Sequence, residues 1–344
     1  MRTAALFCLI GGLAGAAACS GSSSGAKTAV DAKDSGPSTN PVPTVCNGHA
    51  ELCDRSYTAV AFPGCHDSYA TTVDQYTAAD QDRTIAQQLQ DGIRVFHLEM
   101  LDYNGLPNVC HALCAIGHVL LSDELVTIKA FADAHPNEVI TLLTESNGVA
   151  TDEIAAAFDL AQLTPLLHVQ AAGTPWPTLG QMIQGGDRIV VLHADMTKTG
   201  GPSYPWLHDR FARTWETPWN NTTPQDFARC DADRGTKGND IYVVDTYRED
   251  TPIATIDQAR TVNPNPFLID RLLTCKKTES TLPNFVMVNF YDVGDLFTDV
   301  DILNGFTPEP NDDLSKFPPA DWPNPDGGAP DDAGTPVDSG ADGG

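Results

Sequence analysis

The sequence predicts an α/β fold, a (β/α) barrel that forms a single domain over residues 45–307. Two observations favour it. Short apolar runs rich in Val, Ile and Phe alternate with longer amphipathic runs, and repeated strand, helix, strand order implies parallel pairing. The stretch also has the length, roughly 250 residues, that such barrels occupy. No Gly-x-Gly-x-x-Gly or P-loop motif follows a predicted strand, which disfavours a nucleotide-binding open sheet.

The predicted strands are short and apolar, and turn residues bound them. They are 59–62, 93–100, 139–144, 188–194, 241–245 and 285–291. The predicted helices follow at 80–91, 123–134, 151–163, 178–185, 267–275 and 295–303. Several have recognisable ends, because Thr151 precedes two carboxylates as at a helix start, and Gly92 and Gly185 stand where helices stop.

The two ends of the chain flank this domain. Residues 1–18 combine Arg2, a short apolar run and small residues, as in a secretory signal peptide, and the run is too short to span a membrane. Ala-Ala-Ala-Cys19 resembles a bacterial lipobox, so we expect a lipid on Cys19 and a Ser/Gly/Pro-rich tether over 19–44; plain secretion with nearby cleavage is the alternative. Residues 308–344 are rich in Pro, Asp and Gly, and we expect them to be disordered.

The chain is strongly acidic, with 20 Lys and Arg against 46 Asp and Glu and a formal net charge of −26. Nucleic-acid binding requires clustered basic residues, so this class of partner is excluded. An anionic bilayer would repel the chain, so we expect membrane contact to depend on the Cys19 anchor, on apolar residues at the barrel rim or on substrate presented as single molecules. We expect a monomer.

Cysteine usage indicates an oxidising compartment. Seven cysteines follow Cys19, so at least one is free or pairs elsewhere. A metal site at Cys110 and Cys114 is disfavoured, because no second pair with zinc spacing follows. Plausible disulfides by chain order are Cys46–Cys53 and Cys230–Cys275.

Residues with acid–base and metal-binding chemistry lie where the predicted strands end. The active site of a parallel barrel lies at the carboxyl ends of its strands. Strand alternation places two of these residues on one face of the second strand, opposite Phe96 and Leu98. Histidines amid carboxylates suit general acid–base catalysis at a phosphate, or a hard metal ion that assists it. The residues are His66, Asp67, His97, Glu99, His111 and Glu145.

The motifs GCHDSY, QLQDGIRVFHLEM, VCHALC and LSDELVTIKAFADAHPNEVITLLTES, in this order, resemble the catalytic X region of phosphatidylinositol-specific phospholipases C. The later segments PWPTLGQMIQGGDRIVVL, FARCDADRG and FVMVNFYDVGD resemble secreted members. The resemblance implies a distorted (β/α)8 barrel that cleaves a phosphodiester next to the inositol 2-hydroxyl. It implies that His66 is the base or phosphate contact and that His111 is the acid that protonates the leaving glycerol oxygen.

The same resemblance indicates a calcium-dependent site. Members that need no metal have an arginine where this chain has Glu99, and Asp67 and Glu145 match calcium ligands of the metal-dependent group. We therefore expect Asp67, Glu99 and Glu145 to bind one Ca²⁺. His97 stands where the family usually has Glu or Asp. It could serve as a second catalytic base, or it could change which metal binds or how fully the site is occupied. Asn289 stands where many relatives have Asp.

Three further residues are candidate substrate contacts: Arg94, for which a structural ion pair is the alternative, Asp195 and Lys198. The expected substrate is an inositol phospholipid, and the expected location is outside the inner membrane, anchored at the envelope or extracellular. Two other functions stay open. One is a glycerophosphodiester phosphodiesterase or sphingomyelinase-D-like enzyme on the same barrel, and the other is a non-catalytic surface binding lipoprotein.

Overall fold

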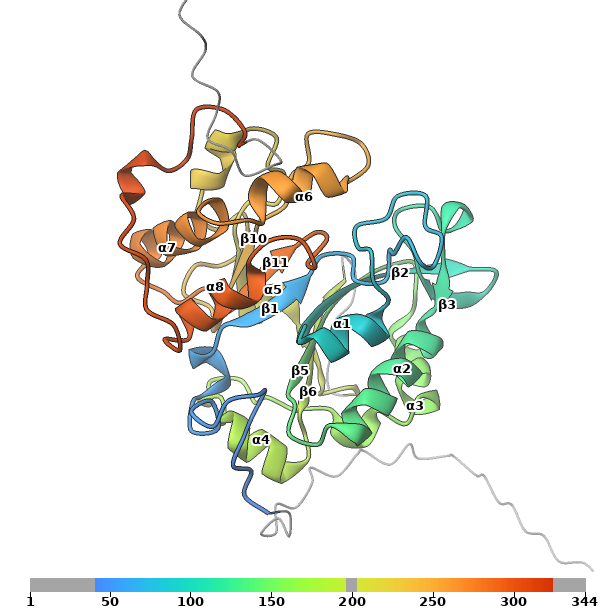
Figure 1. The fold of residues 1–344 in the computed structure, drawn as a ribbon. Coiled ribbons are helices and arrows are strands. Elements are labelled where there is room, and N and C mark those ends of the chain that lie inside the picture. Colours follow the sequence, from blue (N-terminus) through green and yellow to red (C-terminus); the bar gives the residue numbers. More distant parts are fainter. Residues whose placement is uncertain (1–40, 196–202, 324–344) are drawn as a thin grey trace, which may run out of the picture. The chain divides into compact units, whose positions relative to one another are not determined.

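Eight parallel strands form a curled sheet at the centre of the computed structural model, which describes residues 41–195 and 203–323 (Figure 1). All described residues belong to one compact unit. The parallel strands are β1 (Phe62–Cys65), β2 (Val95–Tyr103), β5 (Ile140–Asn147), β6 (Ile189–Asp195), β7 (Leu207–Asp209), β8 (Thr214–Glu216), β10 (Ile241–Asp245) and β11 (Phe285–Val288).

The sheet order is β7-β6-β5-β2-β1-β11-β10-β8-β9. The first strand of the chain therefore pairs with the last, as in a barrel, and the path stays open between β7 and β8, for which the described residues show no pairing. Short antiparallel strands extend it at β3 (Leu106–Val109), β4 (Val119–Leu120) and β9 (Arg234–Gly235). The predicted distorted (β/α) barrel is confirmed.

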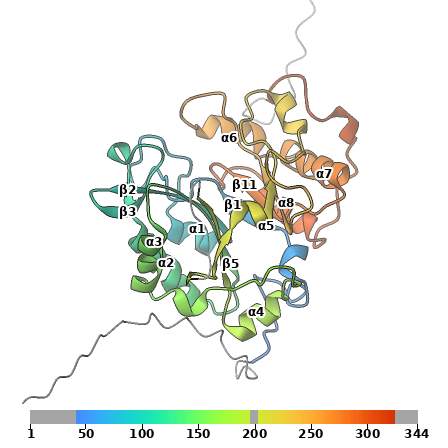
Figure 2. The same cartoon turned by 180° about the vertical axis from the view of Figure 1, so that it is seen from behind.

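The helices lie on the outside of the sheet, as the view from behind also shows (Figure 2). They are α1 (Ile85–Asp91), α2 (Leu121–Ala134), α3 (Thr151–Leu160), α4 (Leu179–Gly185), α5 (Arg210–Arg213), α6 (Ile256–Val262), α7 (Phe267–Glu279) and α8 (Leu296–Leu303). Single 3₁₀ turns occur at η1 (Tyr57–Ala59), η2 (Cys114–Ile116), η3 (Thr164–Leu166), η5 (Pro224–Ala228) and η6 (Leu314–Lys316). As predicted, α1 ends at Gly92, whose left-handed backbone (φ 114°) favours glycine.

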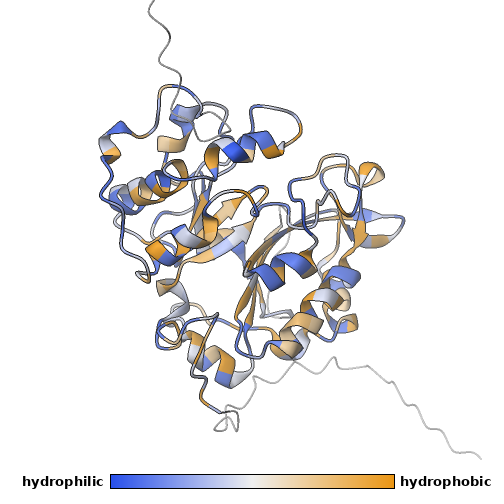
Figure 3. Cartoon of the chain, in the orientation of Figure 1, coloured by the Kyte–Doolittle hydropathy of each residue, from blue (hydrophilic) through white to orange (hydrophobic). Residues whose placement is uncertain are grey.

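Two layers of apolar side chains hold the barrel together, and the strands are largely hydrophobic (Figure 3). Along β2, Phe96 and Leu98 pack outward against the helices, whereas Val95 packs inward. Leu143 of β5 and Met287 of β11 share this inner layer. Because successive side chains of a strand point to opposite faces, the inward set continues along each strand towards its carboxyl end.

The first predicted strand is displaced in the structure. We expected 59–62, but η1 occupies part of that segment and β1 runs from Phe62 to Cys65. Pro63 and Gly64 have low strand propensity, so the sequence pattern predicted a strand that ends before them. In the structure they are in a strand because β2 and β11, on either side, supply hydrogen-bonding partners. The short strands β3, β4, β7, β8 and β9 and helices α5 and α6 were not predicted.

Disulfides form at both pairs expected from chain order, Cys46–Cys53 and Cys230–Cys275. A third joins Cys110 to Cys114, which excludes a metal site there, and Cys65 is free and buried. The signal peptide, Cys19 and most of the tether lie outside the described residues.

The expectation of disorder from residue 308 onward differs from the structure over 308–323. This stretch includes η6, and its Phe317 and Trp322 pack on a small apolar cluster of Phe227, Val262 and Phe267. The average composition of the segment, rich in Pro and Asp, did not indicate that these two aromatic residues would pack on the domain. Within the described residues, the helices are too short or too polar to cross a membrane.

Candidate active site

A cavity of about 180 Å³ lies at the carboxyl ends of the parallel strands. All six predicted catalytic and metal-binding residues line it, together with residues that we did not predict. The lining comprises His66, Asp67, His97, Glu99, His111, Glu145, Arg210, Trp219, Arg234, Asp245, Tyr247, Glu249 and Met287.

The polar residues reach this cavity because they continue the inward-facing rows of the strands. Val95 of β2 is followed on the same face by His97 and Glu99, and Leu143 of β5 is followed by Glu145. The same alternation carries His66 inward after Phe62 and Gly64. The interior of the barrel is thus apolar along most of the strands and titratable at their carboxyl ends. For β2 the sequence predicted this arrangement, because alternation places His97 and Glu99 on the same face.

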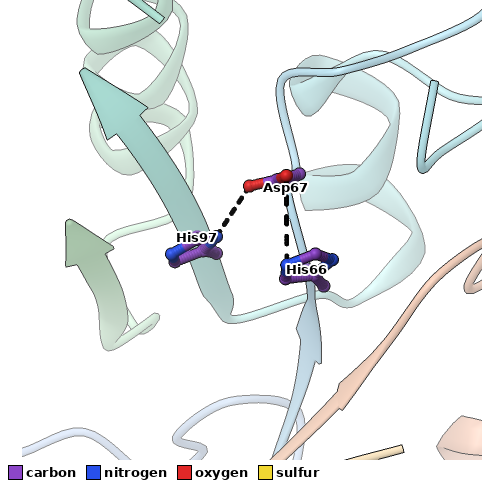
Figure 4. A group of neighbouring side chains, drawn as sticks. All are labelled: His66, Asp67 and His97. Carbon is purple, nitrogen blue, oxygen red and sulfur yellow. Dashed lines mark hydrogen bonds and ion pairs between the residues drawn. The ribbon is translucent and has the colours of Figure 1, made fainter. Parts of the chain in front are cut away.

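Asp67 is the centre of the site (Figure 4). It follows β1 in a left-handed conformation (φ 39°) and is buried. Its Oδ1 is hydrogen-bonded to His97 Nδ1 at 2.8 Å, and its Oδ2 lies 3.9 Å from His66 Nε2 and 3.6 Å from His111 Nε2. Burial alone would raise the pKa of Asp67, but the three histidines hold it well below its usual value. Asp67 is therefore a carboxylate.

His66 is held in one tautomer by a short chain of hydrogen bonds. Its Nδ1 lies 2.9 Å from Asn289 Oδ1, and Asn289 Nδ2 donates to Asp80 Oδ1 at 2.8 Å. Because the carboxylate of Asp80 accepts from the amide, the amide oxygen faces His66, and Nδ1 of His66 must donate to it. Nε2 is then free to accept a proton on the side of Asp67. The ring of Tyr247 stacks on His66 at 4.0 Å.

His111 lies in the loop that the Cys110–Cys114 disulfide closes. Its Nδ1 is 3.3 Å from Asp80 Oδ2 and 3.5 Å from the carbonyl oxygen of Ala78. Asp80 raises the pKa of His111 to about 10, with a further contribution from Asp67 and against the effect of burial. At neutral pH this imidazole is charged and can act as an acid.

Glu99 and Glu145 line the same cavity as Asp67 but have other hydrogen-bond and ion-pair partners. Glu99 Oε2 accepts from the backbone N–H of Ala112 at 3.1 Å, in the loop that carries His111, and burial with the nearby Asp67 raises the pKa of Glu99. Glu145 Oε2 lies 3.7 Å from His97 Nε2 and 3.8 Å from Arg210 Nη1. Burial would raise the pKa of Glu145, but these two basic groups lower it to about 2.

The three residues that we predicted to bind Ca²⁺ all line the cavity, but they do not form one of its close groups of ligand atoms. Calcium takes six to eight oxygen ligands. In the described part of the chain, two groups of three side chains have potential ligand atoms within 4.8 Å of one another, and each group contains histidine nitrogen. Neither includes Glu99 or Glu145. They are His66, Asp67 and His97, and Asp67, Asp80 and His111.

A buried cluster of charges on the other wall of the cavity was missed by the sequence reasoning. Glu216 accepts from Arg210 at 2.6 and 3.1 Å, and Arg234 Nη2 lies 2.8 Å from it. Nη1 of Arg210 has no hydrogen-bond partner and lies 3.8 Å from Glu145. No sequence signal marks Arg210, which belongs to a helix of only four residues. Asp245 and Tyr247 could have been found, since they continue the inward row of β10.

The structure does not bring Arg94 to the site. Arg94 lies at the amino end of β2, where its Nε contacts Glu138 Oε2 at 2.8 Å and its Nη1 donates to backbone carbonyls. The alternative of a structural ion pair is correct, because the residue precedes the strand whose far end carries the chemistry. Asp195 ends β6, but its side chain and Lys198 lie outside the described residues.

A parallel barrel with three histidines around a buried carboxylate at its carboxyl end has the groups that acid–base catalysis requires. Solved structures of phosphatidylinositol-specific phospholipases C have a similar fold. That from Listeria monocytogenes has a TM-score of 0.50 and 16% identity, over 74% of this chain and 95% of that one. A mutant from Staphylococcus aureus has a TM-score of 0.52 and 17% identity, over 72% of this chain and 93% of that one.

Residues 52–304 match the family model PI-PLC X 1. A PI-PLC X domain-containing protein of Arthroderma benhamiae is 28% identical over 285 residues, 76% of this chain and 90% of that protein. One of Arabidopsis thaliana is 24% identical over 267 residues, 71% of this chain and 60% of that protein. The chain belongs to the PI-PLC X family, and it is an enzyme of the phosphoric diester hydrolase type.

Proposed function

We propose that this enzyme cleaves phosphatidylinositol-type lipids by a phospholipase C reaction in which His66 is the base and His111 the acid. The observation that carries the proposal is the placement of both Nε2 atoms near one oxygen of Asp67, at 3.9 and 3.6 Å. One imidazole is fixed by Asn289 with its Nε2 able to accept a proton, and the other is held charged by Asp80. A base and an acid thus flank one small volume.

In this reaction the inositol 2-hydroxyl attacks phosphorus, and Nε2 of His66 accepts its proton. A P–O bond to the 2-oxygen forms while the P–O bond to the glycerol oxygen breaks. His111 donates its proton to that leaving oxygen, so the products are diacylglycerol and an inositol cyclic phosphate. Each histidine ends in the protonation state from which the other began, and both are reset when water opens the cyclic ester or when they exchange protons with solvent.

No step is assigned to Ca²⁺, because the donor set around Asp67 is rich in nitrogen. Positive charge near the phosphate is available from the protein itself. Burial opposes protonation of His97, but its contacts with Asp67 and Glu145 raise its pKa to about 9. Arg210 adds a guanidinium with an unpartnered Nη1. These groups would stabilise charge that develops on the phosphoryl oxygens.

We infer a location outside the cytoplasm. Three disulfides close in the structure, as in proteins from oxidising compartments. A further relative from Arthroderma benhamiae, 28% identical over 300 residues, is called a secreted protein. Anchoring through lipid on Cys19 is part of this proposal and is tested by mass spectrometry of the purified N-terminus.

The activity test uses purified full-length protein and phosphatidylinositol in mixed micelles, with the cyclic product followed by ³¹P NMR. We expect turnover that His66→Ala and His111→Ala each lower by about 10²- to 10⁴-fold, while His49→Ala, at the amino end of the barrel, leaves it unchanged. EGTA should not change the rate. Turnover of glycerophosphoinositol but not of any inositol lipid would favour the glycerophosphodiesterase, and no turnover of either would favour a binding protein.

A further inference from the structure

The segment that follows α8 returns to the loops beside the active site. It runs past α7 towards α6 (Figure 1), beyond residue 304, where the match to the family model ends. We call residues 308–323 the C-terminal strap. Its Phe317 and Trp322 pack on Phe227 and Phe267, with ring centroids 5.2 Å apart for Phe317 and Phe267 and 5.7 Å apart for Trp322 and Phe227. Gln225 also donates to two backbone carbonyls of the strap, each at 3.1 Å.

The strap contacts the loop after β10 through one side chain. The guanidinium carbon of Arg248 lies 3.9 Å from the centroid of the Trp322 ring, the distance of a stacked cation–π pair. Arg248 is fixed in this position from its other sides. Its Nε and Nη2 donate to Asp250 at 2.9 and 2.5 Å, and its Nη1 donates to Thr261 of α6 at 2.9 Å.

The neighbours of Arg248 in the chain line the active-site cavity. Tyr247 stacks on His66, with ring centroids 4.0 Å apart and planes 13° apart, and Glu249 borders the same cavity. Asn221 also holds this loop, because its backbone oxygen accepts from the N–H of Glu249 at 2.8 Å and its amide donates to the carbonyl of Tyr247 at 3.2 Å. Trp322 and Asn221 therefore both contact the loop, at different residues.

We propose that Trp322 is a positioning residue. Through Arg248 it fixes the loop of residues 246–250, so that Tyr247 lies against His66 and the cavity keeps its shape for substrate. Trp322 itself touches neither substrate nor the reacting atoms. The strap, which lies beyond the matched family region, thus supports from outside a loop whose Tyr247 and Glu249 line the cavity. The kinetic consequence rests on the proposed function, whereas the structural one does not.

The test compares Trp322→Ala, Trp322→Phe and a control in the same strap, Lys316→Ala, whose side chain is 82% exposed. Hydrogen exchange of the full-length protein reports on the loop without any need for activity. We expect Trp322→Ala to speed exchange at 246–250 while α2 and α3 exchange as before. With phosphatidylinositol we expect KM to rise by about three- to tenfold with kcat changed less, and Trp322→Phe to restore most of the change.

Unchanged exchange at 246–250 in Trp322→Ala would overturn the proposal, and so would faster exchange spread evenly over the whole domain. Should Trp322→Ala not fold, Trp322→Leu keeps an apolar side chain on Phe227 but removes the aromatic face on which Arg248 stacks, and it makes the same predictions. An inactive wild-type protein would contradict the proposed function, while the exchange data would still decide the role of Trp322.

Discussion

At the scale of single residues, the site is a balance between buried carboxylates and imidazoles. Asp67 and Asp80 are both buried, and between them they contact all three histidines of the cavity. Two buried anions would be costly alone, so the histidines compensate for them, and in return contact with Asp80 raises the pKa of His111. The difference between His66, paired with an amide, and His111, paired with a carboxylate, is the basis of the catalytic roles that we propose for them.

Asp80 gives the first prediction, which concerns pH. Because contact with Asp80 raises the pKa of His111 to about 10, the acid stays protonated through neutral pH, and kcat should fall only as pH rises towards 10. In Asp80→Asn the carboxylate is gone, so the alkaline limb of the kcat profile should move down by at least one pH unit. The measurement is kcat between pH 5 and 10.5.

The matched control for this change is Asp257→Asn, whose exposed carboxylate lies on α6 and pairs with Arg260. Its profile should coincide with that of the wild type. An alkaline limb that stays in place in Asp80→Asn would contradict the assignment of His111 as the acid controlled by Asp80.

Sequence reasoning found the residues of this site that follow strands or lie in recognisable motifs. It missed Asp80 because it placed this residue at the start of a helix over 80–91, whereas α1 begins at Ile85 and Asp80 lies in the loop before it. It missed Arg210 because a helix of four residues gives no periodic signal. It also joined Asp67, Glu99 and Glu145 as calcium ligands. All three lie at the carboxyl end of the barrel, as predicted. The contacts of Glu99 with Ala112 and of Glu145 with Arg210 could not be predicted, because they join segments that only the tertiary structure brings together.

At the scale of elements, most of the predicted site followed from the alternation of side chains along the strands. A row that begins with Val95 must place His97 and Glu99 on the same side, and only the register with β1 and β5 was needed to bring them to Asp67 and Glu145. The first strand was misplaced because Pro63 and Gly64 owe their strand conformation to neighbours that are distant in the sequence. The three-residue strands β7 and β8 carry too few residues for any periodic signal.

The loop between β3 and η2 gives the second prediction. The Cys110–Cys114 disulfide encloses His111, and Glu99 holds the same loop at Ala112. Replacing both cysteines by serine should lower kcat by about 10- to 100-fold, because His111 then samples positions away from the leaving oxygen. The measurement is kcat together with the thermal midpoint of each variant.

A second disulfide provides a matched control. Cys46–Cys53 also closes a short loop of buried cysteines, but neither cysteine lines the cavity. Its double serine variant should lose stability and keep kcat. Equal losses of kcat in the two variants would show that the effect at Cys110 and Cys114 is one of stability alone.

Helix α8 gives the third prediction. Asp299 is buried in its first turn, where Asn265 donates to Oδ1 at 2.7 Å, while Oδ2 has no hydrogen-bond partner. Burial raises the pKa of Asp299 to about 7 from an ordinary value near 4. Between these two pH values the unfolded chain has lost the proton that the folded chain keeps, so stability falls as pH rises from about 4 to about 7.

Asp299→Asn removes this titration. Its free energy of unfolding should be close to that of the wild type at pH 4.5 and should exceed it at pH 8 by on the order of 2 kcal/mol. Urea unfolding at the two pH values measures the difference. A variant that loses stability equally at both would show that Asp299 is needed as a carboxylate, which the unpartnered Oδ2 argues against.

At the scale of the whole molecule, hydrophobic periodicity predicted the barrel well, whereas average amino-acid composition predicted the C-terminal segment less well. The acidic, Pro-rich stretch after residue 307 has the average composition of a disordered segment, yet Phe317 and Trp322 suffice to attach its first part to the domain. Two aromatic side chains in a short stretch can offset the entropy of ordering it, because each buries a large apolar surface. An average over the segment does not reveal them.

The net charge of −26 gives the last prediction. A chain of this charge is repelled by vesicles that contain anionic lipid, and salt weakens the repulsion because the Debye length shortens from about 30 Å at 0.01 M to about 8 Å at 0.15 M. For the full-length protein made as Cys19→Ser, so that no lipid anchors it, the rate on phosphatidylinositol vesicles should therefore rise with NaCl over this range. The rate on a soluble, single-molecule inositol phosphodiester should change far less. A vesicle rate that falls with salt would instead show that a local basic surface docks the enzyme on the membrane, with the cavity arginines Arg210 and Arg234 as the first residues to replace.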